Sequence, residues 1–249
     1  MRIEPTILQI LSGSTVNGNV ICLPGTLDRA TYERTDKVLR GLGGKWDRKA
    51  RGHVFPFDPA DALENAISTG SFVNRQQEYQ AFYTPPAVAE YMLSHAKLDQ
   101  PNLFIVEPSI GTGNLATAIA QHAREDCEIV GIDIDPVAVK KSQELGFTVL
   151  DMDFLSFRGL RFDRAIANPP FTRGQDVDHV HHMYKVLEPG GRVVSVMSER
   201  INWARDKKSV DFREFVAQKG GEFHDLPEES FKSADTPVKT VFVVIDKAA

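Results

Sequence analysis

Strand-length apolar runs and helix-length segments alternate along the chain from about residue 80 to its end. The apolar runs occupy residues 103–107, 128–133, 147–150, 162–167, 192–197 and 239–245. Helical patterns occupy residues 114–124, 136–145 and 211–218. Since parallel neighbouring strands need long crossover connections, usually helices, this order predicts a mostly parallel sheet with helices on both faces. We expect an α/β doubly wound sheet of seven strands, ending in a hairpin.

The first 75 residues follow a different pattern, which predicts a small N-terminal α+β unit. Apolar runs at residues 7–11 and 20–23 flank Asn17-Gly18, a dipeptide that favours a tight hairpin turn. They predict the first two strands of a ββαβα arrangement. A polar stretch at residues 74–78 predicts a joint, so we expect a small unit at 1–76 and a larger domain at 77–249.

The composition is ordinary for a globular protein. Of the 249 residues, 42% are hydrophobic and 25% are charged, and no apolar run approaches the ~20 residues of a membrane-spanning helix. Residues 1–5 contain charges and a proline where a signal peptide would need an apolar core. Cys22 and Cys127 lie far apart and fit no metal-ligand spacing. We therefore expect a cytoplasmic protein with no membrane partner.

The net charge of −5 conceals a basic segment at residues 29–51. This segment holds eight basic and three acidic residues, so its charge is +5 while the rest of the chain sums to −10. Because phosphate binding needs a local basic patch, the segment predicts a nucleic-acid contact. The candidate phosphate-binding residues are Lys45, Arg48, Lys49 and Arg51. The alternative is a solvated helix face followed by a charged turn, and we expect Trp46 to lie in the core of the small unit.

Two loops beyond the carboxyl ends of the predicted strands favour a nucleoside-containing cofactor, since doubly wound sheets bind ligands there. The first loop runs from Glu107-Pro108 through Gly111 and Gly113, whose flexibility lets the backbone approach a ligand closely. The next strand ends at Asp133, 22 residues after Gly111. This is close to the ~20-residue spacing at which an acid meets ribose hydroxyls. The alternative for the same residues is packing and helix capping.

The loops after the third and fourth strands add further polar and aromatic groups. Asp153-Phe154 offers a carboxylate and a ring, which suit hydrogen bonding and stacking to an adenine. The fourth strand leads into Asn168-Pro169-Pro170-Phe171. Prolines cannot donate backbone hydrogen bonds, so they end the strand and fix a rigid loop with free carbonyls. An amide, stiff carbonyls and an aromatic ring therefore meet at one point.

These motifs together resemble the amino-methylating DNA methyltransferases. They are Phe82-Tyr83-Thr84-Pro85, Glu107-Pro108-Ser109-Ile110-Gly111-Thr112-Gly113, Gly131-Ile132-Asp133-Ile134-Asp135 and Asn168-Pro169-Pro170-Phe171. Their order resembles the adenine-N6 group over about residues 80–245. The resemblance implies a Rossmann-like class I methyltransferase fold and the cofactor S-adenosylmethionine. It implies that the cofactor is surrounded by Tyr83, Thr84, Glu107, Pro108, Gly111, Gly113, Asp133, Ile134, Asp153 and Phe154. It also implies that Asn168, Pro169, Pro170 and Phe171 are catalytic and hold the target amine.

The chemistry of adenine agrees with that implication. The exocyclic N6 amine is a poor nucleophile because its lone pair is delocalised into the ring. If the Asn168 side-chain oxygen and the Pro169 carbonyl accept its two hydrogens, a pyramidal nitrogen is favoured and the lone pair is freed. Phe171 would stack on the target base once that base has left the nucleic-acid helix. We expect adenine-N6 methylation of nucleic acid, and of DNA rather than RNA.

The same motifs are compatible with other functions. Release-factor glutamine methyltransferases also use an Asn-Pro-Pro-aromatic loop, so protein glutamine-N5 methylation is the alternative, with RNA adenine methylation beside it. A third reading is a non-catalytic nucleic-acid-binding module. A cluster of acids and histidines suggests a metal site, but helix capping is the favoured interpretation and we expect no metal; the cluster is Asp176, Asp178, His179, His181 and His182. Residues 230–236 loosely resemble a loop near the target pocket of related enzymes.

Overall fold

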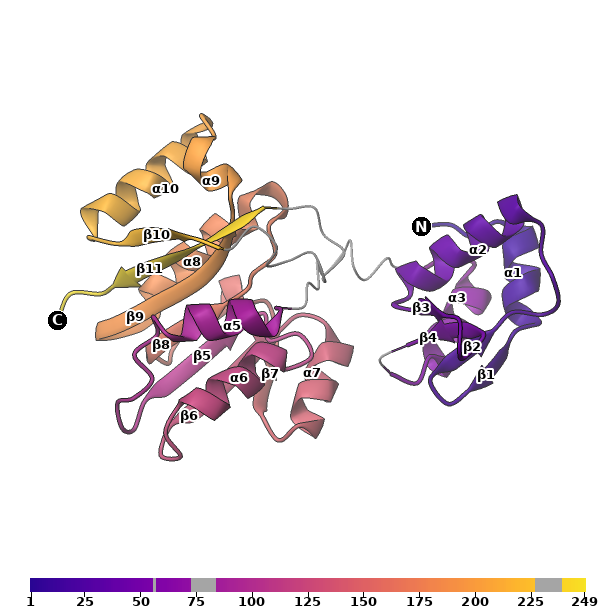
Figure 1. The fold of residues 1–249 in the computed structure, drawn as a ribbon, viewed down its shortest axis with the longest axis horizontal. Coiled ribbons are helices and arrows are strands. Elements are labelled where there is room, and N and C mark those ends of the chain that lie inside the picture. The colour runs from indigo at the N-terminus through magenta and orange to yellow at the C-terminus, as the bar shows by residue number, and fades with distance from the viewer. Residues whose placement is uncertain (56, 73–83, 227–238) are drawn as a thin grey trace. The chain divides into compact units, whose positions relative to one another are not determined.

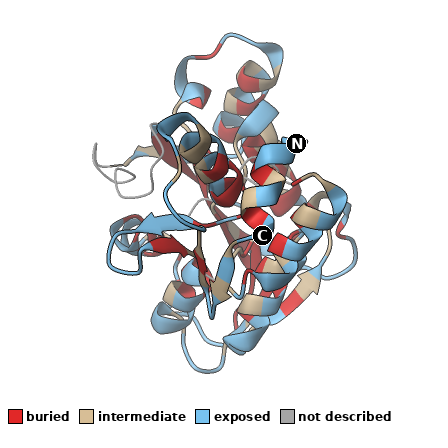
Figure 2. Cartoon of the chain, turned by 90° about the vertical axis from the view of Figure 1, so that its right-hand side faces the viewer, coloured by how far each residue is buried: buried red, intermediate tan, exposed pale blue. Residues whose placement is uncertain are grey.

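The computed structural model describes residues 1–55, 57–72, 84–226 and 239–249. The chain divides into two compact units, Met1–Ala81 and Phe82–Ala249 (Figure 1). In both units buried and exposed residues alternate along the helices, so that each helix turns one face to a core (Figure 2).

The larger unit is built on a seven-stranded sheet. Its strands are β5 (Phe104–Pro108), β6 (Glu128–Asp133), β7 (Thr148–Asp151), β8 (Phe162–Ala167), β9 (Leu187–Ser198), β10 (Glu222–Asp225) and β11 (Thr240–Asp246). The order across the sheet is β10-β11-β9-β8-β5-β6-β7. Strands β5 to β9 pair in parallel, whereas β11 is antiparallel to both β9 and β10. The doubly wound α/β sheet predicted from the sequence is thereby confirmed.

Helices cover both faces of this sheet. They are α5 (Pro86–Leu93), α6 (Asn114–His122), α7 (Pro136–Glu144), α8 (Gln175–Lys185), α9 (Arg200–Trp203) and α10 (Lys207–Gln218), with short 3-10 turns η1 (Phe154–Ser156) and η2 (Thr172–Gly174). Neighbouring strand residues point to opposite faces. Ile105 packs in one core cluster with residues of α5 and α6, whereas Val106 packs in another with residues of α8 and α10. The sheet is therefore sandwiched between two helical layers.

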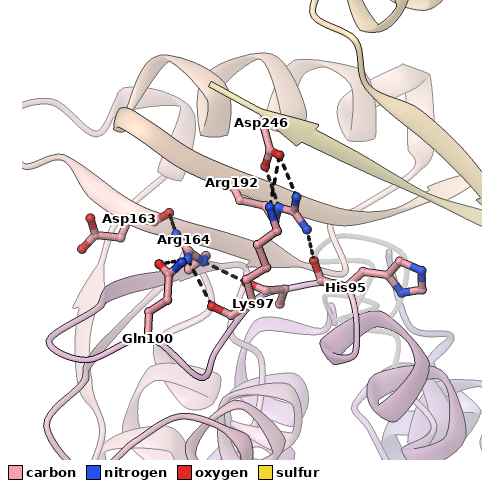
Figure 3. A network of polar contacts seen from close by, with 8 residues as sticks. His95, Lys97, Gln100, Asp163, Arg164, Arg192 and Asp246 are labelled. Carbon is pink, nitrogen blue, oxygen red and sulfur yellow. Dashed lines mark hydrogen bonds and ion pairs between the residues drawn. The ribbon is translucent and has the colours of Figure 1, made fainter. Parts of the chain in front are cut away.

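Two arginines fasten the segment after α5 to the sheet (Figure 3). The buried guanidinium of Arg164, on β8, donates to three oxygens of this segment: Ala96 O (2.8 Å), Lys97 O (3.1 Å) and Gln100 Oε1 (2.5 Å). Arg192, on β9, donates to the backbone oxygen of His95 at 2.6 Å and forms an ion pair with Asp246 on β11. These contacts hold α5, and with it the residues that lead into α5, against the central strands.

The N-terminal unit is α+β, but its first element differs from the prediction. Residues 7–11 were expected to form a strand, and they lie instead in α1 (Pro5–Ser12). Pro5 occupies the first turn of this helix, and Ile7 and Leu11 are buried four residues apart on one face. The apolar spacing thus had the helical period, and the proline marked a helix start.

The remaining elements of this unit surround one small core. They are β1 (Thr15–Asn17), β2 (Val20–Cys22), α2 (Arg29–Gly41), β3 (Lys45–Asp47), β4 (Gly52–Val54) and α3 (Ala60–Thr69). The four strands form a sheet in the order β1-β2-β4-β3. The turn that joins β1 to β2 is Gly18-Asn19, one residue later than the predicted Asn17-Gly18, because Asn17 pairs with Val20 as the last residue of β1; β3 lies at an edge. Within the described residues, no helix is long and apolar enough to cross a membrane.

Candidate cofactor and target site

The glycine loop after β5 folds back onto the neighbouring strand β6. The backbone N–H groups of Ser109 and Ile110 both donate to Ile132 O, at 2.7 and 3.0 Å. Gly111 and Gly113 then adopt φ values of +57° and +82°, in the left-handed region that glycine tolerates best. Gly113 directly precedes α6, so the loop delivers the backbone to the start of a helix, as the sequence predicted.

Asp133, at the end of β6, organises this loop. Its Oδ2 accepts a hydrogen bond from Gly111 N at 2.7 Å, and its Oδ1 accepts one from Asp135 N at 2.8 Å. Burial raises the pKa of the Asp133 carboxyl, although these backbone donors favour its charged form. The sequence used the spacing from Gly111 to place Asp133 near a ribose, and the structure shows in addition that the two residues are in direct contact.

Glu107 is the buried carboxyl of the site. It is 2% exposed, and its Oε2 atom has no hydrogen-bond partner among the described residues. Burial, and then the nearby charge of Asp133, raise the pKa of the Glu107 carboxyl well above its ordinary value. A buried polar atom without a partner is costly in a folded protein. Glu107 is therefore suited to receive a donor or a positive charge from a ligand.

Gly111 and Gly113 differ in how much free space surrounds them. A Cβ on Gly111 would meet nothing within 4 Å, so a ligand can approach the backbone there. A Cβ on Gly113 would instead lie 2.9 Å from a methyl carbon of Leu145. Ser142, on α7, closes the back of the loop by donating its hydroxyl to Gly111 O at 2.8 Å. The loop is thus packed against α7 behind Gly113 and open at Gly111.

Beyond β7 the structure corrects one expectation. Asp153 is exposed at the carboxyl end of the sheet and caps η1 by accepting from Leu155 N at 2.9 Å. Phe154 was expected to present its ring for stacking, but it is only 3% exposed and packs edge-on against His182. Phe154 therefore anchors Asp153 and offers no free ring. An apolar side chain that is exposed at this edge is Ile134, at 55%.

The Asn168-Pro169-Pro170-Phe171 loop follows β8 at the same end of the sheet. The Asn168 side chain donates through Nδ2 to the hydroxyl of Thr84 at 3.0 Å. Thr84 is buried and precedes α5, the helix that Arg164 and Arg192 fasten to the sheet. Pro169 is buried, and Phe171 packs partly buried against the core on the α5 side. The sequence named both Thr84 and Asn168, but no local signal indicated that they touch.

The acidic and histidine residues at the start of α8 have structural partners. Asp176 is buried and accepts from Ser198 N at 3.1 Å, which ties α8 to the end of β9. His179 contacts Gln175 O at 2.9 Å and His182 contacts Phe157 O at 3.0 Å. Burial lowers the pKa of both imidazoles. Among the described residues, no group of three or more potential metal ligands comes together.

In the N-terminal unit, the predicted phosphate-binding residues lie on one hairpin. Lys45 is on β3, and Arg48, Lys49 and Arg51 are in the turn to β4, all of them exposed. Trp46 was expected in the core, but it is 40% exposed because β3 is an edge strand. Its ring packs edge-on against His53 at 5.4 Å and against Tyr32 at 6.1 Å. Tyr83 and residues 230–236 lie outside the described residues.

Parts of this chain are similar to known methyltransferases. The Methyltransferase domain family matches residues 105–191. The tRNA1(Val) (adenine(37)-N6)-methyltransferase of Haemophilus influenzae is 35% identical over 78 residues, which are 27% of this chain and 34% of that protein. The modification methylase CviBIII of Paramecium bursaria Chlorella virus NC1A is 30% identical over 36% of this chain and 26% of its own. The chain thus spans about a third or less of the length of these relatives.

Solved structures with the same architecture have low sequence identity to this chain. A Listeria monocytogenes protein assigned as a class I S-adenosylmethionine-dependent methyltransferase aligns over 76% of this chain and 67% of its own, with a TM-score of 0.57 and 16% identity. A type I restriction-modification system methyltransferase subunit of Streptococcus thermophilus aligns over 77% and 50%, with a TM-score of 0.56 and 16% identity. The Phe82–Ala249 unit therefore has the class I methyltransferase fold, and together with the family match to residues 105–191 this implies S-adenosylmethionine as the methyl donor.

Proposed function

We propose that this protein transfers a methyl group from S-adenosylmethionine to the N6 amine of adenine in a nucleic acid, with DNA as the expected substrate. The observation that carries the proposal is the hydrogen bond from Asn168 Nδ2 to Thr84. Because the amide nitrogen is engaged as a donor, the Asn168 oxygen is the atom oriented to accept a hydrogen from a substrate amine.

The residues of the cofactor side fit a nucleoside sulfonium ligand. Asp133 would meet the ribose hydroxyls, Asp153 would accept from the adenine amine, and Ile134 would cover an adenine face. Gly111 leaves room for close backbone approach, and the buried Oε2 of Glu107 suits a positively charged amino-acid portion. Tyr83, Thr84, Pro108 and Gly113 complete the proposed cofactor site, with Phe154 supporting Asp153. When bound, S-adenosylmethionine supplies an electrophilic methyl group.

The target side would then position the amine. Asn168 and the carbonyl of Pro169 accept the two N6 hydrogens, which favours a pyramidal nitrogen with a free lone pair. Pro170 stiffens the loop, and Phe171 offers a ring to the target base. Orientation of this kind supplies ~7 kcal/mol or more in well-aligned intramolecular reactions. No general base is needed beforehand, since the nitrogen becomes acidic only after methylation.

The N-terminal hairpin supports nucleic acid as the substrate. Among the described residues, Arg48, Lys49 and Arg51 make no ion pair, in contrast to Arg29 and Arg34 of the same segment, which pair with Glu33 and Glu4. Exposed cations without acidic partners are available to phosphates. With Lys45 they form the proposed phosphate-binding hairpin, and the exposed Trp46 adds an aromatic surface beside them.

Glutamine-N5 methylation of a release-factor-type protein is the second candidate, because the Asn-Pro-Pro-aromatic loop suits any planar amide or amine nitrogen. The described part of the N-terminal unit combines helices α1, α2 and α3 with a four-stranded sheet, whereas the corresponding appendage of that family is helical, so the presence of the sheet favours the leading proposal. RNA adenine methylation shares all the chemistry of the leading proposal and differs only in the polymer.

The test is transfer of labelled methyl groups from S-adenosylmethionine to duplex DNA, single-stranded DNA, RNA and release factor, with Asn168→Ala as control. Label that digestion recovers as N6-methyladenine, and that is absent with Asn168→Ala, is expected. Label found only in protein would move the chemistry to glutamine. Cofactor binding without methylation of any adenine-containing polymer would refute the proposal.

A further inference from the structure

The most exposed large apolar side chain of the described residues is Trp203, at 66%. It ends the short helix α9, directly after the long strand β9. Tryptophan is highly buried on average, because its ring carries a large apolar area. An indole that is held on a helix and left in solvent therefore points to a ligand that covers it.

Basic residues flank this tryptophan in the sequence. Residues 200–208, here called the α9 corner, hold four basic residues and one acidic residue, a net charge of +3. The whole unit at 82–249 has nineteen basic and twenty-five acidic residues, a net charge of −6. Arg200 pairs with Asp206 at 2.7 Å, but Arg205 and Lys207 are exposed and make no ion pair with any described residue. The corner is a positive site on a negative unit.

The α9 corner is fastened to the loop that follows the target motif. Strands β8 and β9 run in parallel, with Ala167 opposite Ser195, so the corner and Asn168 both follow carboxyl ends of adjacent strands. Lys208 Nζ lies 3.5 Å from the backbone oxygen of Arg173, two residues after Phe171. The same ammonium pairs with Asp178 of α8 at 2.6 Å. The corner therefore has a fixed position beside the target loop.

Arg173 adds another cation on the target side of this junction. Its φ of +58° is uncommon for a residue other than glycine, and Gly174 follows with a φ of +71°. The side chain of Arg173 is exposed and contacts no acidic group among the described residues. An arginine held in this conformation projects a charge next to the residues proposed to hold the target base.

We propose that the α9 corner, together with Arg173, binds the unpaired nucleic-acid strand on either side of the target adenine. Trp203 stacks on a neighbouring base, and Arg205, Lys207 and Arg173 contact phosphates. An aromatic face flanked by free cations is the composition of single-strand-binding surfaces. A protein substrate would give these three cations no comparable set of negative charges. The inference rests on the proposed function, because it names the contact surface for the same substrate.

The chain has only two tryptophans, so fluorescence can examine each separately. In the Trp46→Phe variant, Trp203 is the sole indole, and in Trp203→Phe, Trp46 is. We expect a single-stranded oligonucleotide containing adenine to quench the Trp203 emission of full-length Trp46→Phe. Oligonucleotide binding detected by polarisation, with Trp203 emission unchanged, would overturn the inference.

Affinity measurements give an independent readout. Trp203→Ala should weaken binding of single-stranded DNA by about fivefold or more, and Arg205→Ala should lower the dependence of log affinity on log salt by about 0.7. Lys185→Ala is the matched control, because this exposed lysine ends α8 about 16 Å along the helix from its start near the corner. Trp203→Ala and Arg205→Ala variants that bind like wild type would refute the surface.

The outcomes also separate the inference from the proposed function. If adenine is methylated and the Trp203 variants bind nucleic acid like wild type, the proposed activity is supported and only the binding surface is refuted. Absence of both nucleic-acid binding and adenine methylation would refute the proposed function together with the inference. Quenching of Trp203 by release factor, without quenching by nucleic acid, would assign the corner to a protein substrate and overturn the inference. Unchanged melting temperature and cofactor affinity of Trp203→Ala would confirm that the variant is folded.

Discussion

The two halves of the sheet's carboxyl edge satisfy their polar groups in different ways. On the cofactor side, the loops after β5 and β6 contact one another, and Asp133 binds backbone N–H groups of both. On the target side, Asn168 is held by the side chain of Thr84, from a segment 84 residues away. The cofactor side carries buried carboxyls, whereas the target side adjoins exposed cations.

This difference indicates how one edge can serve two ligands of opposite charge. Buried acids suit a ligand with hydroxyls and positive charge, while exposed cations suit a polyanion. The cofactor side is rigid through its own backbone, so single side-chain changes there should alter cofactor affinity. The target side depends on contacts between distant segments, so changes there should alter methyl transfer more than cofactor affinity.

The largest expected effect is that of Asn168→Ala on methyl transfer. Loss of one preorganised hydrogen-bonding group in an active site costs ~100-fold or more in rate. We expect a loss of this size in the single-turnover rate, with cofactor affinity from calorimetry changed less than about threefold. A matching loss of cofactor affinity would show that the two halves of the edge are not separate.

Asp133→Ala should have the converse effect. It removes the acceptor for Gly111 N and the proposed ribose contact, so we expect cofactor affinity to fall by roughly 10- to 100-fold. Asp151→Ala is the control, because Asp151 lies opposite Asp133 on β7 and is exposed. Equal losses from the two variants would indicate a general charge effect and not a specific contact.

Thr84→Val tests whether the contact between distant segments positions the catalytic amide. Valine keeps the shape of threonine but removes the oxygen that accepts from Asn168, and we expect the methyl-transfer rate to fall about tenfold. Thr84→Ser should restore most of the rate, because it restores the hydroxyl. If the role of Thr84 is purely structural, both variants should instead have a lower melting temperature, and their methyl-transfer rates should fall to the same extent.

Glu107→Gln should change how stability depends on pH. The folded-state pKa of Glu107 is raised well above its ordinary value of 4.5, so the folded protein keeps a proton that the unfolded chain releases. This contribution is complete below about pH 4.5 and is lost as pH rises through the folded pKa, by at most about 1.4 kcal/mol per pH unit. Glutamine cannot titrate.

Denaturant unfolding without cofactor, at several values between pH 5 and 8, measures this difference. The stability of wild type relative to Glu107→Gln should decrease as pH rises. A difference that stays constant across this range would mean that Glu107 is not the titrating group.

The smallest effect is expected in the N-terminal hairpin. The double variant Arg48→Ala/Lys49→Ala should lower the salt dependence of duplex DNA binding by about 1.8, because each lost phosphate contact contributes about 0.9. Arg29→Ala/Arg34→Ala removes the same charge from the same segment, but these arginines are already paired with acids. If the two double variants lower the slope of log affinity against log salt equally, the effect is one of general charge and the hairpin makes no specific phosphate contact.

The sequence by itself determined the α/β order and the loops that meet at the carboxyl edge. These features follow from local periodicity and from parallel strands, whose equivalent ends lie together. It did not determine the helix at residues 7–11, where an apolar run was read with the strand period although Pro5 marked a helix start.

Only the tertiary structure decided which of the named side chains are buried, exposed or in contact. Phe154 was available for stacking by sequence, yet the rings of α8 cover it, and Trp46 is exposed because β3 lies at an edge. The Thr84–Asn168 bond and the raised pKa of Glu107 depend on residues brought from distant segments. Local patterns specify strands and loops, but burial and hydrogen bonding depend on partners that only the packed chain supplies.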